Sequence, residues 1–303
     1  MKKIIVGSRD SILAVAQTNL VIDALKKHYP SLSIELVTLK TTGDKILNRP
    51  LDKIGGKGLF VKELDVALLE GRIDLAVHSL KDLPMEENPD LPIAAFVKRG
   101  DPRDCLVLPS TTSWMDSCSF SNPDAYTAKL LQKVGSSSLR RQIQLKALCS
   151  QANVFSVRGN IHTRLKKLDQ GDFSSLILAA SGLSRARLSS RISRYFSTDE
   201  MIPAAGQGIL CVQCRKDFDT SILSCIHDTE TALAAAAERS FVRTLNGGCS
   251  APIAAYASLS QEHLTLRGMF YHEERKELYR KTIEGHFSDG SRLGNELAKS
   301  MLI

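Results

Sequence analysis

Strand and helix patterns alternate along the N-terminal part of the chain, and this alternation restricts the possible folds. Short apolar runs at residues 3–6, 34–39 and 73–77 have the pattern of strands. Between the first two runs, apolar residues recur at helical spacing as far as Lys27. Strand–helix–strand repeats of this size are typical of a largely parallel sheet with helices on both faces. The sequence therefore predicts an α/β fold.

A second α/β unit begins near Cys105. Residues 133–134, 153–157 and 175–179 each form a short apolar run, followed by small residues and then by a helical pattern. The same alternation thus occurs twice, and we expect two α/β domains.

Two connecting segments have a different composition. Residues 111–123 are rich in Ser and Thr and contain the only tryptophan, Trp114, so we interpret them as a surface loop. Residues 203–208, Pro-Ala-Ala-Gly-Gln-Gly, have the composition of a hinge.

The last eighty or so residues follow another pattern. An alanine-rich helix is expected at 231–245 and a final helix at 291–301. Alternating runs at 253–259, 263–271 and 277–284 are joined by short polar connections, so these strands must be antiparallel. This region is predicted to be a small α+β domain.

Composition excludes several classes of protein. The 303 residues are 43% hydrophobic and 24% charged, an ordinary globular balance that suggests about two or three domains. The seven cysteines form no CxxC pair, so neither a disulfide framework nor a metal site is expected. Without a signal peptide or an apolar run of about 20 residues, we expect a reduced cytoplasmic protein.

The net charge of +7 suggests that the protein binds a negatively charged partner. No run of five basic residues or basic amphipathic helix is present, and aromatic residues make up only 6%, so nucleic acid and membrane are not expected partners. The basic residues instead occur singly or in pairs beside glycine and serine, which favours a small polyanion.

Cations and serines gather where strands are expected to end. In open α/β sheets the ligand lies outside the carboxyl ends of the strands, where helix N-termini offer free N–H groups. We expect an anion site there, with the side chains of Arg140 and Arg141 in solvent, paired with ligand carboxylates. A single arginine of this kind is more often a solvated surface residue. The residues at these turns are Arg9, Ser11, Asp82, Ser136, Ser137, Ser138, Arg140, Arg141, Arg158 and Arg164.

Two residues stand apart chemically. Cys249 follows Gly247-Gly248 and precedes Pro252, so it lies on a turn without flanking side chains, although most free cysteines are buried small hydrophobes. Asp82 is an acid next to Lys81 in a cationic region. Its carboxylate either forms a simple ion pair or caps a helix, or it stabilises a cation during a reaction or moves a proton.

The run His78-Ser79-Leu80-Lys81-Asp82-Leu83-Pro84 closely resembles the porphobilinogen deaminase (hydroxymethylbilane synthase) family. The resemblance extends almost end to end, and its other motifs are 6–9, 55–60, 135–141, 158–160, 206–208 and 247–249. It implies two periplasmic-binding-protein-like α/β domains with mostly parallel sheets, 1–99 with 202–220 and 104–201, and an α+β domain, 226–303. It also implies a transferase that joins four porphobilinogen molecules head to tail, releases ammonia and hydrolyses off hydroxymethylbilane.

The resemblance also implies residue roles. The cofactor is a dipyrromethane held by a thioether to Cys249, and Asp82 is the catalytic carboxylate. The implied contacts to cofactor and substrate are Arg9, Ser11, Lys53, Lys57, Ser79, Lys81, Ser136, Ser137, Ser138, Arg140, Arg141, Arg158, Gly159, Arg164, Ala180, Arg185, Gly206, Gln207 and Gly248.

Two rival functions differ in class. A solute-binding protein has the same two-domain fold but usually an export signal, and it needs no cysteine domain. A DNA-binding regulator needs a basic recognition helix, which this sequence does not contain. We therefore expect a monomeric enzyme with a small-molecule substrate.

Overall fold

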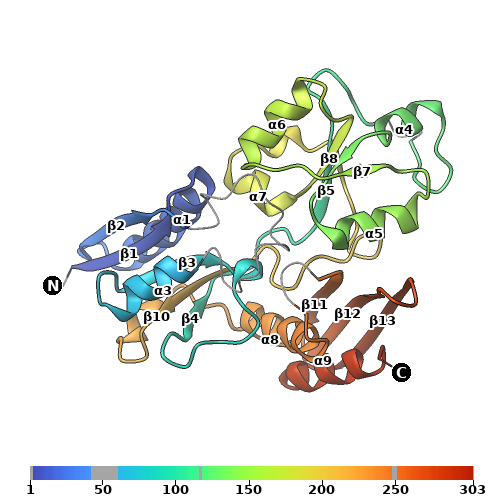
Figure 1. Cartoon of the computed structure of the whole chain (residues 1–303). Coiled ribbons are helices and arrows are strands. Elements are labelled where there is room, and N and C mark those ends of the chain that lie inside the picture. Colours follow the sequence, from blue (N-terminus) through green and yellow to red (C-terminus); the bar gives the residue numbers. More distant parts are fainter. Residues whose placement is uncertain (1–2, 42–60, 116–117, 248–250, 303) are drawn as a thin grey trace.

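The computed structural model describes residues 3–41, 61–115, 118–247 and 251–302. Three lobes follow one another in sequence colour, blue to cyan, green to yellow and orange to red (Figure 1). The first two lobes are each built on a five-stranded sheet and the third on a three-stranded sheet.

Domain 1 contains the sheet β2-β1-β3-β10-β4. Strands β1, β2 and β3 are parallel, whereas β10 runs antiparallel to both of its neighbours. Its helices and strands are β1 (Ile4–Arg9), α1 (Ile12–His28), β2 (Ile34–Leu39), α3 (Lys62–Leu69), β3 (Leu75–Ser79), the 3-10 helix η2 (Leu80–Asp82), β4 (Ile93–Phe96), β10 (Leu210–Cys214) and η4 (Thr220–Leu223).

Helix α1 illustrates how the local sequence fixes an element. The Ser11 side chain accepts a hydrogen bond from the Ala14 N–H at 3.2 Å and caps the N-terminus. Its last turn is basic, which complements the helix dipole. Val21, Ile22 and Leu25 are buried in one cluster with the sheet residues of domain 1, so α1 is held by its apolar face.

Domain 2 contains the sheet β7-β6-β8-β5-β9, in which β5 is the antiparallel strand. In both sheets four strands share one direction, so the prediction of mostly parallel sheets is confirmed. Its elements are β5 (Asp104–Val107), α4 (Ala125–Leu130), β6 (Val134–Gly135), α5 (Leu139–Leu148), β7 (Val154–Phe155), α6 (Ile161–Asp169), β8 (Ser175–Ala179), α7 (Ala180–Arg185), η3 (Ser189–Arg191) and β9 (Arg194–Tyr195).

The interpretation of residues 111–123 as a surface loop is only partly correct. Phe120 is buried in the core of domain 2, with its ring 5.3 Å from that of Phe196, and Trp114 packs against it at 5.2 Å. The Arg194 guanidinium lies over all three rings. The polar composition concealed an aromatic cluster that closes one end of this core.

Domain 3 packs α8 and α9 on an antiparallel sheet β11-β12-β13. The three predicted strands and two helices of this region are confirmed. Its elements are α8 (Thr229–Thr244), β11 (Ile253–Ser260), β12 (His263–His272), β13 (Glu277–His286), η5 (Phe287–Asp289) and α9 (Gly290–Lys299).

Two chain segments cross between the α/β domains. The first runs from β4 to β5 and the second from β9 to β10, and Figure 1 shows β10 within the sheet of the first lobe. The segments are hydrogen bonded to each other, with the Gly100 N–H donating to the Gly208 carbonyl at 3.0 Å. This arrangement groups the strands as the boundaries 1–99 with 202–220 and 104–201 imply, although the exact bounds remain a prediction.

A carboxylate of domain 3 holds both crossing segments. Glu238 of α8 is fully buried and accepts hydrogen bonds from the Arg99 guanidinium at 2.5 Å and from the Gly206 N–H at 2.7 Å. It also accepts one from the Ala257 N–H of β11 at 2.8 Å. Residues 203–208, predicted as a hinge, are therefore held to Glu238 by the hydrogen bond of Gly206.

Substituting Gly208 by alanine tests the close approach of the crossing segments. Gly208 has φ of +89°, and a Cβ there would lie 2.8 Å from the Gly100 carbonyl oxygen. Gly171 has a similar φ of +85° but open space around it, so Gly171→Ala is the matched control. We expect Gly171→Ala to lower the free energy of unfolding by about 1 kcal/mol through backbone strain, and Gly208→Ala by about 3 kcal/mol through strain and overlap. Urea denaturation measures both, and equal losses would contradict the prediction.

Candidate functional site

The predicted site residues lie at the carboxyl ends of parallel strands. In domain 1, Arg9 ends β1 and Ser79 ends β3. In domain 2, Ser136 follows β6, Arg158 follows β7 and Ala180 follows β8. The remaining described members of the set flank these ends: Ser11, Lys81, Asp82, Ser137, Ser138, Arg140, Arg141, Gly159, Arg164, Arg185, Gly206 and Gln207.

Asp82 ends the short 3-10 helix η2, which directly follows β3. The Leu80 N–H donates to the Ile209 carbonyl at 3.0 Å, and Leu80 and Leu83 are buried, so the turn is anchored on both sides of the carboxylate. Asp82 itself is half-buried. Its neighbour Lys81 donates to the Gln207 Oε1 at 3.3 Å, which joins this turn to the second crossing segment.

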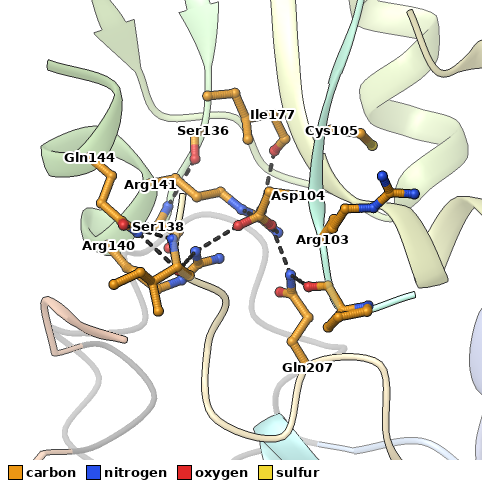
Figure 2. A network of polar contacts seen from close by, with 12 residues as sticks. Arg103, Asp104, Cys105, Ser136, Ser138, Arg140, Arg141, Gln144, Ile177 and Gln207 are labelled. Atoms are coloured by element: carbon orange, nitrogen blue, oxygen red, sulfur yellow. Dashed lines mark hydrogen bonds and ion pairs between the residues drawn. The ribbon is translucent and has the colours of Figure 1, made fainter. Parts of the chain in front are cut away.

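Arg140 and Arg141 share one carboxylate, that of Asp104 at the start of β5. The Arg140 Nη1 lies 2.6 Å from Asp104 Oδ2, and the Arg141 Nε lies 2.9 Å from Oδ1. Gln207 donates to the same Oδ1 at 3.0 Å. Figure 2 shows Asp104 at the centre of this network, with the two arginines and Gln207 directed toward it.

The expectation that Arg140 and Arg141 lie in solvent is wrong. Their exposed fractions are 4% and 8%, and each also donates to a backbone carbonyl, Arg140 to Ile202 and Arg141 to Ile177. Exposure could not be inferred from a helix N-terminus alone, because the partner Asp104 is distant in sequence. The two guanidinium groups help to hold the domain together.

Asp104 is an acid whose environment keeps it ionised. Burial alone raises the pKa of its carboxyl, but the charges of Arg140 and Arg141 outweigh burial and hold the pKa below its ordinary value of 3.8. Sequence reasoning missed this residue. The available signal was an acid at the start of an otherwise apolar strand, in a region rich in cations.

Positive charge exceeds negative charge around this network. Burial, and then the charge of Arg141, lower the pKa of the Lys81 ammonium to about 8, although Asp82 acts in the opposite direction. Burial, followed by the charges of Arg141 and Arg158, lowers the pKa of Arg164 to about 10. Because these positive charges repel one another, an anion bound among them would be stabilised.

Arg158, Arg164 and Arg185 are three cations of the predicted site. Arg164 and Arg185 donate to the carbonyls of Gly159 and Gly208, at 2.7 and 2.5 Å. Burial lowers the pKa of Arg185 to about 10. Within the part of the chain that the structure describes, no carboxylate pairs with Arg158, Arg164 or Arg185. This set of donors therefore suits a ligand with several carboxylates.

The serines have mixed roles. Ser137 accepts from the Val157 N–H at 3.1 Å and donates to the Val157 carbonyl at 2.7 Å, which joins the ends of β6 and β7. Ser136 is buried, and its Oγ accepts from the Ser138 N–H at 3.3 Å. Ser79 donates to Gln17 of α1 at 3.1 Å. These contacts shape the turns around the cations.

Four predicted residues, Lys53, Lys57, Gly248 and Cys249, lie outside the described residues. The six described cysteines are buried or half-buried, and burial is the leading cause that raises the pKa of Cys105 and of Cys211 to about 12. These two thiols are unreactive at neutral pH.

Two other features are absent from the described residues. Among the described residues, no group of three or more His, Cys, Asp and Glu side chains is placed to hold a metal ion. In the same ranges, no helix is long and apolar enough to cross a bilayer.

Comparisons with known proteins agree on one family. The family profile "Porphobilinogen deaminase, dipyromethane cofactor binding domain" matches residues 4–223, and "Porphobilinogen deaminase, C-terminal domain" matches residues 232–303. The porphobilinogen deaminase of Acetivibrio thermocellus is 51% identical over 99% of this chain and 98% of its own. That of Ruminiclostridium cellulolyticum is 49% identical over the same shares.

The solved structures that match this chain are distant in sequence. The effector-binding domain of BenM with benzoate has a TM-score of 0.44 at 16% identity, covering 74% of this chain and 88% of that one. The sulphonate-binding protein SsuA of Escherichia coli has a TM-score of 0.40 at 14% identity, covering 81% and 71%.

The two α/β domains, the small third domain and the family matches together define a cofactor-dependent transferase. The chain belongs to the porphobilinogen deaminase family. The family carries a dipyrromethane cofactor and functions in porphyrin and heme biosynthesis. The solute-receptor alternative is not favoured.

Substituting Asp104 by asparagine tests the structural role of the arginine pair. The change leaves two buried cations without their carboxylate, so we expect the free energy of unfolding at pH 7 to fall by about 3–5 kcal/mol. Asp169→Asn is the control, because it breaks the more exposed Arg191–Asp169 pair and should cost about 0–1 kcal/mol.

The stability of wild type and of Asp104→Asn, measured at several pH values, tests the lowered pKa of Asp104. Because the folded pKa is depressed, the contribution of Asp104 is complete above its ordinary pKa of 3.8 and is lost as the pH falls through the folded value. The stability difference between wild type and Asp104→Asn should therefore narrow on acidification below that pH. A constant difference down to pH 2 would contradict the assignment.

Proposed function

We propose that this protein joins four porphobilinogen molecules head to tail on a dipyrromethane primer, releases ammonia at each addition and finally hydrolyses off hydroxymethylbilane. The observation that supports this most strongly is the half-buried carboxylate of Asp82 on an anchored turn, next to Lys81, which in turn lies near the charges of Arg141 and Arg140. The end-to-end family match supplies the substrate class.

Cys249 attaches the primer through a thioether. A carbon–sulfur bond to a thiol is stable, so it can retain the growing product through every addition. When bound, the dipyrromethane supplies the pyrrole carbon to which the first substrate is joined. Glycine, the residue type at 248, has no side chain that would crowd a bulky group on the neighbouring sulfur.

The cations bind the carboxylates of primer and substrate. Each porphobilinogen unit carries an acetate and a propionate, and guanidinium groups bind such groups by paired hydrogen bonds. Arg9, Lys81, Arg158, Arg164 and Arg185 are the described members of this group, with Lys53 and Lys57 as further proposed members. Arg140 and Arg141 contribute while remaining fixed by Asp104.

The remaining proposed contacts come from the turns. Ser11, Ser79 and Ser136–Ser138 set the backbone at the strand ends, while Gly159, Ala180, Gly206 and Gln207 leave room or offer backbone groups.

Asp82 stabilises the cation that forms when ammonia leaves porphobilinogen. The loss of the amine produces an azafulvene cation, and a carboxylate at fixed position lowers its free energy without reorganisation. The same carboxylate accepts the pyrrole N–H and can move the proton that carbon–carbon bond formation releases. The anchored η2 turn provides the fixed position.

The cellular context follows from the same proposal. The protein acts as a monomer in the cytoplasm, on a small-molecule substrate and without nucleic acid. Size-exclusion chromatography with light scattering measures the oligomeric state.

A covalent adduct tests the attachment site. We expect the purified active protein to exceed the mass of its sequence by a dipyrromethane, and to give a colour with Ehrlich's reagent. Cys249→Ala should fold but carry no adduct. Cys225→Ala, which removes a half-buried thiol, should keep it. An unmodified mass in active protein would contradict the assignment.

Substituting Asp82 by asparagine separates binding from chemistry. The amide preserves size but removes the charge, so we expect porphobilinogen binding to persist and turnover to fall at least ~100-fold. Asp82→Glu should be intermediate, because the charge moves by one methylene group. The exposed Asp90→Asn in the same domain is the control. Single-turnover ammonia release measures the rates in protein whose cofactor content is checked by mass, and a near-normal rate in Asp82→Asn would assign the role elsewhere.

A further inference from the structure

Helix α8 of domain 3 packs directly against the turn that carries Asp82. Ala235 is fully buried and belongs to one apolar cluster with Leu80 and Leu83, the residues on either side of the Lys81-Asp82 pair. One helical turn further along α8, Arg239 lies on the same face. The catalytic turn is therefore supported by a helix from another domain.

Arg239 holds the chain immediately after Asp82. Its exposed fraction is 3%, and its Nη2 donates to the Pro84 carbonyl at 2.7 Å and to the Met85 carbonyl at 3.1 Å. The same nitrogen lies 3.7 Å from the Glu87 carboxylate. A buried guanidinium that donates to two consecutive carbonyls fixes the direction of the backbone there.

The two ends of the catalytic turn thus have different anchors. At the first end, the Leu80 N–H donates to the Ile209 carbonyl at 3.0 Å. After the second end, the Arg239 side chain donates to the carbonyls of Pro84 and Met85. Met85 then packs against the core of domain 3. Removing Arg239 therefore releases the backbone that follows Leu83 and leaves the anchor at Leu80 in place.

Helix α8 also precedes the Gly-Gly-Cys motif in the sequence. It ends at Thr244, and Gly247, the first residue of the Gly-Gly-Cys motif, follows three residues later. From Arg239 to Thr244 the helix rises about 1.5 Å per residue, or roughly 8 Å in total. The same helix that contacts the backbone at Pro84 and Met85 therefore ends three residues before Gly247 in the sequence.

We propose that Arg239 is a positioning residue for the reaction, which fixes the Asp82 carboxylate relative to the helix that leads to the cofactor-attachment turn. This inference rests on the proposed function. In this role Arg239 acts through the backbone at Pro84 and Met85. Without it, Asp82 keeps its charge but loses its fixed position.

The test compares Arg239→Met and Arg239→Lys in cofactor-loaded enzyme. Methionine retains apolar bulk but removes every donor, whereas lysine retains the charge and can reach one carbonyl. Because displacing a catalytic group by about 1 Å costs up to ~100-fold, we expect Arg239→Met to lower kcat by roughly 10- to 100-fold with KM within about twofold. Arg239→Lys should recover part of kcat. Arg243→Met, an exposed arginine in the last turn of α8, is the matched control and should have normal kcat.

The outcomes separate this inference from the proposed function. Cofactor content is measured by intact mass, and rates are expressed per loaded molecule. If wild-type holoenzyme releases no ammonia from porphobilinogen, the proposed function is wrong. If wild type is active and both Arg239 variants have normal kcat, or lose only thermal stability, the positioning role is wrong. If Arg239→Met does not fold, Arg239→Lys alone decides, since an unchanged kcat there overturns the proposal.

Discussion

The buried carboxylate of Glu238 is the interaction on which the three-domain arrangement depends. Its two oxygens accept from Arg99 on the first crossing segment, from the Gly206 N–H on the second and from the Ala257 N–H of β11. Arg99 also donates to the Gln207 carbonyl at 2.9 Å and lies over the Tyr256 ring. Because an ionised carboxylate only accepts, it can satisfy several donors from different segments at once. A neutral side chain of similar size offers fewer acceptor positions, so the crossing segments need this charge.

The described carboxylates at the domain junction differ in burial and in the number of their donors. Glu238 and Asp104 are fully buried and occupied by several donors each, so neither has spare capacity for a ligand. Asp82 is half-buried, on an anchored turn beside Lys81. Gln207 links the groups, since it donates to Asp104 and accepts from Lys81. Arg158, Arg164 and Arg185 have no carboxylate partner among the described residues, so their charges are available to an anion, as the proposed function requires.

The sequence predicted those features that local pattern determines. Strand–helix alternation indicated both α/β domains, and short polar connections indicated the antiparallel sheet of domain 3. Burial of Arg140 and Arg141 was not predictable, because Asp104 lies more than thirty residues away and pairs with them only after folding. The core role of Trp114 was hidden by its polar neighbours. The anchoring of the Asp82 turn by Arg239 depends on contact between two domains, which no local periodicity contains.

The antiparallel strand β10 imposes an order on folding. In the sheet of domain 1, β4 neighbours only β10, which is more than one hundred residues further along the chain. During synthesis from the N-terminus, β4 therefore has no partner until domain 2 has been made. Domain 2 is continuous from β5 to β9 and needs no later strand. Since loop closure precedes the gain from distant contacts, the middle of this chain is expected to become native before its beginning does.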